Sequence, residues 1–156
     1  MQLEAGQPAP PFTATDQDGN ELTLADFRGQ NLVMYFYPKA FTPGCTTESC
    51  DFRDRRDLFA AAGYSILGVS PDQPEKLNRF RAEYDLPFPL LSDPDHAIAE
   101  AYGAWGTKKN YGKEYEGIIR STIAIDPSGT VINVWHNVRA KGHAERVADA
   151  VLVDTG

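Results

Sequence analysis

Two apolar runs separated by a helical pattern constrain the fold of this chain more than any other feature. Residues 32–37 (LVMYFY) and 65–70 (SILGVS) are typical of strands that are covered on both faces of a sheet. Between them, residues 46–62 are predicted to form a helix that ends at Gly63, where glycine caps helices. The apolar stripe of that helix is expected to consist of Phe52, Leu58, Phe59 and Ala62. This strand–helix–strand order predicts two parallel strands in one sheet.

The flanking segments predict further elements around this unit. Residues 12–15 and 21–24 alternate around an Asp-Gly turn, which favours an N-terminal β-hairpin. Asp72 is expected to cap the helix that follows the second buried strand. The remaining expected elements are a helix over 74–84, a strand over 87–91, a short helix over 97–102, a hairpin of 118–125 with 130–134, and a closing helix over 144–151. The whole pattern favours an α/β fold of the thioredoxin-like type, with a mixed sheet flanked by helices.

Composition limits the class of protein. The 156 residues show no repeat or linker, so we expect a single domain over 1–156. A net charge of −7 argues against a nucleic-acid partner, which needs a basic face. No apolar run approaches the ~20 residues that cross a membrane, and the N-terminus has no signal-peptide pattern, so a cytoplasmic location is expected. The two cysteines are too few for a disulfide scaffold.

Cys45 occupies the position where open α/β sheets place their sites, between a buried strand and the start of a helix. A free thiol has a pKa of ~8.5, so little of it is thiolate at neutral pH. Making the thiolate predominant needs roughly 3–4 kcal/mol of preferential stabilisation. A helix N-terminus supplies ~0.3–1 kcal/mol and at most ~2. A cation or further donors must therefore lie close, and the spacing of residues does not identify them.

Cys50 follows Cys45 by five positions on the same predicted helix. In an intact helix their Cα atoms would be about 8.5 Å apart and would point about 140° away from each other. A disulfide needs Cα atoms within ~7 Å. Oxidation of this pair to a disulfide therefore requires the first turns of the helix to unwind.

The sequence allows several other roles for the two cysteines. Two cysteines in an intracellular protein are often inert core residues. A zinc site needs four ligands, and His96, His136 and His143 have no ligand-like spacing. An iron–sulfur cluster needs four thiolates, and a thioredoxin motif has two residues between its cysteines rather than four. No histidine has the context of a Cys-His hydrolase.

Residues 36–48 (FYPKAFTPGCTTE) resemble the active-site segment of peroxiredoxins, in which a proline, a threonine and a cysteine recur at the spacing of Pro38, Thr42 and Cys45. The Thr-Pro-Gly-Cys-Thr version, with a second cysteine five residues later, is similar to the bacterioferritin comigratory protein, or peroxiredoxin Q, subfamily. Residues 102–106 (YGAWG) and 117–122 (GIIRST) resemble it too, so the likeness covers nearly the whole chain.

The resemblance implies a thioredoxin-dependent peroxidase of the atypical two-cysteine type. It makes Cys45 the peroxidatic thiolate and Cys50 the resolving cysteine, which form an intramolecular disulfide that thioredoxin or a similar dithiol reduces. Thr42 would hydrogen-bond the peroxide, Pro38 would shield the thiol, and Arg120 would be the cation beside it. Hydroperoxides are the implied substrates, no metal or other cofactor is implied, and a monomer is expected because the disulfide needs no second subunit.

The sequence departs from the subfamily pattern directly before the Thr-Pro-Gly-Cys motif, and Ile123 and Ala124 replace a more usual aromatic residue, which we interpret as a core adjustment. Ala40 and Phe41 replace a more polar pair of the subfamily, which we expect to change the rim of the pocket. Lys108, Lys109 and Lys113 are expected to lie in a solvated loop, with docking of an acidic reductase as the other interpretation. A general thiol–disulfide oxidoreductase and a non-enzymatic metal- or peroxide-sensing module are the competing functions.

Overall fold

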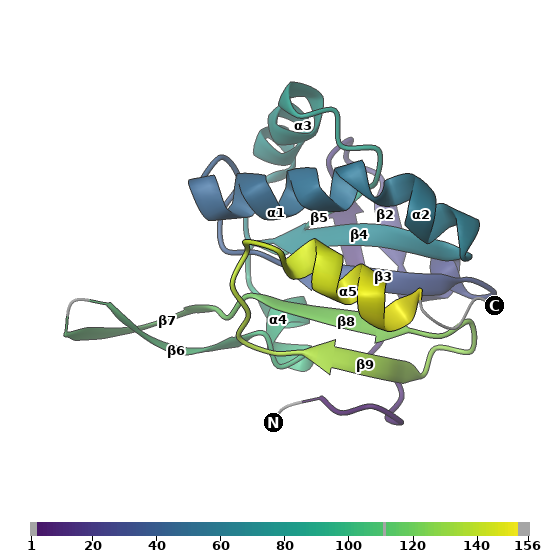
Figure 1. Ribbon diagram of the computed structural model, residues 1–156. Helices are drawn as coiled ribbons and strands as arrows, with labels where there is room; N and C mark the ends of the chain where they lie inside the picture. Colours follow the sequence, from purple (N-terminus) through teal and green to yellow (C-terminus); the bar gives the residue numbers. More distant parts are fainter. Residues whose placement is uncertain (1–2, 111, 153–156) are drawn as a thin grey trace.

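A mixed β-sheet forms the middle layer of the protein (Figure 1). The computed structural model describes residues 3–110 and 112–152, and within them seven strands build this sheet. Their order is β2 (Glu21–Thr23), β1 (Thr13–Asp16), β5 (Leu90–Ser92), β4 (Tyr64–Ser70), β3 (Asn31–Phe36), β8 (Ser121–Ile125) and β9 (Val131–Trp135). The neighbours β5, β4 and β3 run parallel, and every other pair is antiparallel. The expected parallel centre, N-terminal hairpin and late hairpin are all confirmed.

Strand β3 lies inside the sheet, between β4 and β8, and this position explains the first apolar run. Val33 pairs with Ile66 on one side and with Ala124 on the other. Because side chains alternate along a strand, Met34 and Phe36 enter the core on one face while Val33 and Tyr35 enter the core on the opposite face. Both faces are covered, so residues 32–36 are all buried.

Helices cover both faces of the sheet. One face is packed against α1 (Pro43–Asp54), α2 (Arg56–Ala61), α3 (Pro74–Glu83) and α5 (His143–Val151). The other face is covered by α4 (Ala97–Ala101) and the N-terminal segment, near which the 3₁₀ turn η1 (Leu24–Phe27) packs. None of the helices in the described part of the chain has the length and apolar character needed to cross a bilayer.

The helix expected over 46–62 is wrong in two respects. It begins earlier, at Pro43, because proline is suited to the first turn of a helix. It is also broken at Arg55, whose φ of −105° and ψ of 5° leave the helical range. Leu58 is 59% exposed instead of lying in the core, whereas Phe59 is fully buried.

Two other sequence expectations are wrong. Gln73, not Asp72, is the N-cap residue of α3, and the Asp72 carboxylate makes other contacts described below. The basic segment is not a loop but a hairpin of β6 (Trp105–Asn110) and β7 (Lys113–Ile118), which projects from the body of the molecule (Figure 1). We call this hairpin the arm. Polar residues on both of its faces hide the alternation that normally reveals a strand.

Candidate active site

Cys45 lies at the third position of α1, directly after the loop that leaves β3. Its side chain is 1% exposed, and Cys50 is half-buried farther along the same helix. Both thiols are free. The structure therefore confirms that the two cysteines share one intact helix, the geometry in which a disulfide between them cannot form.

The first turn of α1 follows from local sequence. Thr42 is the N-cap residue with extended backbone, Pro43 takes the first helical position, and the amide of Thr46 donates to the carbonyl of Thr42 at 2.9 Å. Gly44 has a specific purpose, since a Cβ at this position would lie 3.3 Å from Nη2 of Arg120. Because Gly44 has no Cβ, the Arg120 guanidinium can lie against the start of α1.

Arg120, between β7 and β8, bridges the thiol and a buried carboxylate. Its Nη2 donates to Sγ of Cys45 at 3.3 Å, and its Nη1 donates to Oε1 of Glu48 at 2.6 Å. A predominant thiolate at Cys45 needs a nearby cation or further donors, and Arg120 lies there. Arginine suits this position because its planar fork serves two acceptors at once.

Burial and ion pairing compete at this bridge. Burial raises the pKa of Glu48 to about 7, although the charge of Arg120 and its hydrogen bond act in the opposite direction. Burial alone would lower the pKa of Arg120, but Glu48 and Cys45 outweigh it and raise that pKa. The guanidinium is thus charged throughout the physiological range, whereas Glu48 titrates within it.

The loop that joins β3 to α1 carries two other residues singled out by the sequence. Pro38 lines a cavity of about 390 Å³ together with Arg120. The other lining residues are Thr107, Lys108, Lys109, Ile119, Asn137 and Val138. The hydroxyl of Thr42 donates to the carbonyl of Lys39 at 2.7 Å, so its oxygen keeps its lone pairs free as acceptors.

Asp72 holds this loop in place, which the sequence did not predict. Its Oδ2 accepts from the amide of Ala40 at 2.7 Å and from the hydroxyl of Ser70 at 2.9 Å, and Lys76 lies 3.2 Å from its Oδ1. Phe41, which follows Ala40 in the loop, has a left-handed φ of +70°, which is strained for a bulky side chain. The loop is thereby anchored to the segment that starts α3.

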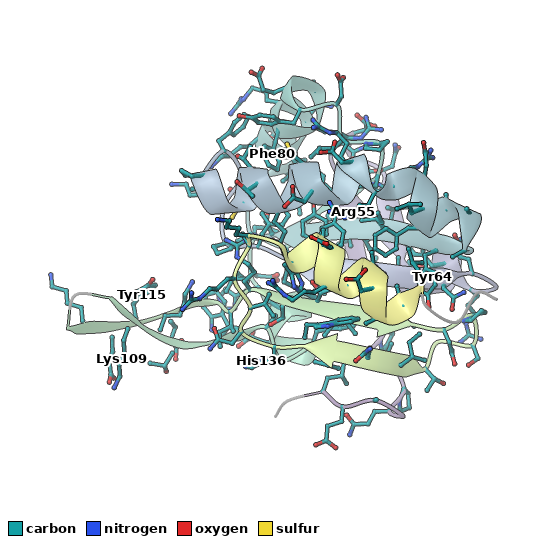
Figure 2. The ribbon with its side chains drawn as sticks, in the orientation of Figure 1. Arg55, Tyr64, Phe80, Lys109, Tyr115 and His136 are labelled. Carbon is teal, nitrogen blue, oxygen red and sulfur yellow. The ribbon has the colours of Figure 1, made fainter. Side chains whose placement is uncertain are left out.

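Phe41 does not lie at the rim of the cavity, contrary to expectation. Its ring is 5.2 Å from that of Phe80 and 6.3 Å from that of Tyr84, so it packs on α3. Figure 2 shows Phe80 on the side of the helix layer where α3 sits. The replacement of a polar residue by Phe41 therefore adds an aromatic anchor for the loop.

The histidines do not contact Cys45. His143 is buried, and its Nε2 lies 2.7 Å from the hydroxyl of Thr122. Burial first, and then the charges of Arg146 and Arg120, lower the pKa of His143 to about 4, so it is neutral at pH 7. Within the described ranges no three His, Cys, Asp or Glu side chains are grouped to hold a metal ion.

Comparison with known proteins assigns this arrangement to a family. The profile of the AhpC/TSA family matches residues 5–134. The chain belongs to this family. It is 50% identical over 145 residues to a putative peroxiredoxin of Mycobacterium tuberculosis strain H37Rv, covering 93% of this chain and 92% of the relative. It is 48% identical over 151 residues to the peroxiredoxin Bcp of Bacillus subtilis strain 168, covering 97% and 94%.

A solved structure supports the same family assignment. The bacterioferritin comigratory protein of Xanthomonas campestris, a protein described as reducing alkyl peroxides, superposes with a TM-score of 0.88 at 38% identity, covering 95% of this chain and 97% of that one. The expected thioredoxin-like fold and the resemblance to the peroxiredoxin Q subfamily are therefore confirmed. The chain is a peroxiredoxin, a member of the thiol-dependent peroxidases.

Proposed function

We propose that this peroxiredoxin reduces hydroperoxides through Cys45, with Cys50 as the resolving cysteine and thioredoxin or a similar dithiol as the reductant. The observation that carries the proposal is the 3.3 Å contact between Arg120 and the Cys45 sulfur at the start of α1. It supplies the charge-assisted donor that a helix terminus alone cannot replace.

In the first step the Cys45 thiolate attacks the terminal oxygen of the peroxide. The S–O bond forms as the O–O bond breaks, which leaves a sulfenic acid on Cys45 and an alkoxide or hydroxide that takes a proton to become an alcohol or water. Arg120 stabilises the negative charge as it moves from sulfur to the leaving oxygen. Thr42, whose proton is committed to Lys39, accepts the hydrogen bond of the peroxide O–H.

In the second step the Cys50 sulfur attacks the Cys45 sulfur, the S–OH bond breaks, and the hydroxide leaves as water. Two buried contacts of α1 must open first, between Glu48 and Arg120 and between the hydroxyls of Ser49 and Tyr35, which are 2.9 Å apart. Burial raises the pKa of the Cys50 thiol in the folded helix, so unwinding also makes it a better nucleophile. The dithiol then reduces the disulfide and is itself oxidised.

A coupled assay tests this function directly. Purified protein, thioredoxin, thioredoxin reductase and NADPH are mixed with hydrogen peroxide or cumene hydroperoxide, and NADPH oxidation is followed. We expect one NADPH oxidised per peroxide reduced, and an internal disulfide in the oxidised protein. Reduction of insulin disulfides without peroxide consumption would establish the general oxidoreductase instead.

Replacing Arg120 by alanine is expected to slow the peroxide step about 10²- to 10³-fold, the usual effect of removing one donor to a developing oxyanion. Arg120→Lys should recover part of the loss because it keeps the charge but not the fork. Stopped-flow measurement of the step with the Cys50→Ser protein isolates this effect from resolution. An Arg120→Ala protein that reacts at the wild-type rate would remove Arg120 from this role.

Replacing Asp72 by alanine is expected to slow the peroxide step about tenfold and to lower the free energy of unfolding by about 1–3 kcal/mol, because the buried amide of Ala40 loses its acceptor. Asp72→Asn keeps an acceptor, so it should retain most of the rate of the peroxide step and most of the free energy of unfolding. Lys76→Met serves as the control, since it removes only the ion pair. Chemical denaturation and stopped flow measure the two effects; equal losses in Asp72→Asn and Asp72→Ala would contradict the role of this hydrogen bond.

We propose that the enzyme acts as a monomer in a reducing compartment such as the cytoplasm. Both cysteines belong to one helix, so resolution needs no partner subunit, and a cycling disulfide needs a reductant that such a compartment maintains. Light scattering after gel filtration of the reduced and oxidised protein tests the first point. A dimer in both redox states would overturn it.

A further inference from the structure

Lys108 brings a second cation to the cavity that Arg120 and Pro38 line. It lies on β6 of the arm, yet its side chain is half-buried and lines the same cavity as Arg120 and Pro38. The adjacent Lys109 also borders the cavity, but its side chain is 77% exposed and lies 3.6 Å from Glu114. Figure 2 shows Lys109 and Tyr115 on the projecting arm. Lys108 is thus the arm lysine whose charge is partly shielded from solvent.

The opposite strand of the arm contacts Lys108. Its cross-strand partner is Tyr115, and its Nζ lies 6.0 Å from the centre of that ring, at the limit of a cation–π contact. A Cβ on Gly117 would lie 3.4 Å from Cδ of Lys108, so the glycine leaves room for the lysine stem. These contacts favour one location for the ammonium group over free rotation in solvent.

The charges around Cys45 give a second cation a role whenever Glu48 is ionised. When Glu48 is ionised, it offsets the charge of Arg120, to which it is bonded at 2.6 Å. A thiolate on Cys45 would then leave two negative charges and one positive charge in a mostly buried cluster. Such an imbalance is unfavourable where the dielectric is low. One more positive charge at the cavity restores neutrality.

Lys108 and Cys45 influence each other electrostatically. Burial and then the charge of Arg120 lower the pKa of Lys108, while Cys45 acts in the opposite direction. Such coupling is reciprocal. If a thiolate on Cys45 stabilises the protonated form of Lys108, protonated Lys108 stabilises the thiolate by the same free energy.

We propose that Lys108 is a second cationic residue of the peroxidatic site, which acts through Cys45 by holding it as the thiolate. The arm is then part of the active site, since it carries this charge to the cavity. The inference rests on the proposed function only in the identity of the attacking group. Its test can be separated from peroxide reduction, because the thiolate can be measured without peroxide.

The experiment measures alkylation of Cys45 by iodoacetamide as a function of pH in the Cys50→Ser background, where Cys45 is the remaining thiol. Lys108→Gln is expected to move the pH midpoint of alkylation upward and to slow alkylation about three- to tenfold below that midpoint. Lys108→Arg should restore the wild-type profile because it restores the charge. The difference between Lys108→Gln and wild type should shrink at high salt.

Lys113→Gln is the matched control, because Lys113 is an exposed lysine of the same arm that does not line the cavity. It should leave the alkylation profile unchanged. An unchanged profile in Lys108→Gln, or an equal shift in Lys113→Gln, would overturn the proposal. If the alkylation profile shifts as expected but the protein with both cysteines fails to consume peroxide, Lys108 keeps its role and the proposed function fails. Circular dichroism of each variant verifies that the fold is retained.

Discussion

Replacing Cys45 with serine is expected to abolish thioredoxin-coupled peroxide consumption, with a loss of at least about four orders of magnitude, as for removal of other catalytic nucleophiles. Serine is nearly isosteric and can still accept the hydrogen bond from Arg120, so the buried site keeps its shape. Its hydroxyl, however, is almost entirely protonated at neutral pH and is a poor nucleophile toward peroxide oxygen. The coupled assay and single-turnover stopped flow both measure the loss.

The loss must come from chemistry and not from misfolding. Denaturation of Cys45→Ser should resemble that of the wild-type protein, because the substitution removes no apolar contact larger than one sulfur atom. Thr47→Ala, at an exposed position two residues farther along α1, is the control and should keep full activity. Sustained peroxide turnover by Cys45→Ser would show that another group attacks the peroxide.

Strand β3 could be predicted from the sequence because its pattern and its surroundings agree. Residues 32–37 are apolar at every position, and each of them packs into one of the two cores. The break at Arg55 could not be predicted, since residues 46–62 contain no glycine or proline to mark it. The arm was missed because Lys108, Lys109 and Glu114 are poor strand residues, stabilised only by contacts across the hairpin.

In the active site, too, residues close together in the sequence could be predicted, whereas contacts between residues far apart in the sequence could not. Pro38, Thr42 and Cys45 lie within eight residues, so a motif can reveal them. Glu48 and Arg120 are 72 positions apart, and Ala40 and Asp72 are 32 apart. No periodicity links such pairs, and their contacts depend on how β8 and β4 are ordered beside β3. The resemblance supplied Arg120, but nothing in the sequence indicated that Asp72 would bind the loop.

Replacing Cys50 with serine is expected to leave one turnover intact and then to stop the thioredoxin-coupled reaction. Cys45 would reduce one equivalent of peroxide per chain and remain a sulfenic acid, because no thiol in the chain could displace the hydroxyl group. Trapping with dimedone and mass spectrometry would detect the sulfenic acid, whereas the wild-type protein should yield the disulfide. A small thiol should restore turnover, and sustained turnover with thioredoxin alone would contradict the resolving role.

The stability of α1 determines what happens to the stalled sulfenic acid. Opening its first turns breaks the buried hydrogen bonds of Glu48 and Ser49, each of which contributes only about 0.5–3 kcal/mol net. We therefore expect the helix to open repeatedly in the wild-type protein, and we expect Cys50 to remove the sulfenic acid before a second peroxide arrives. In Cys50→Ser each opening is unproductive, and the helix closes again with the sulfenic acid beside Arg120 in the site that activates peroxide. We therefore expect this variant to accumulate sulfinic acid under excess peroxide, at concentrations where the wild-type protein still cycles.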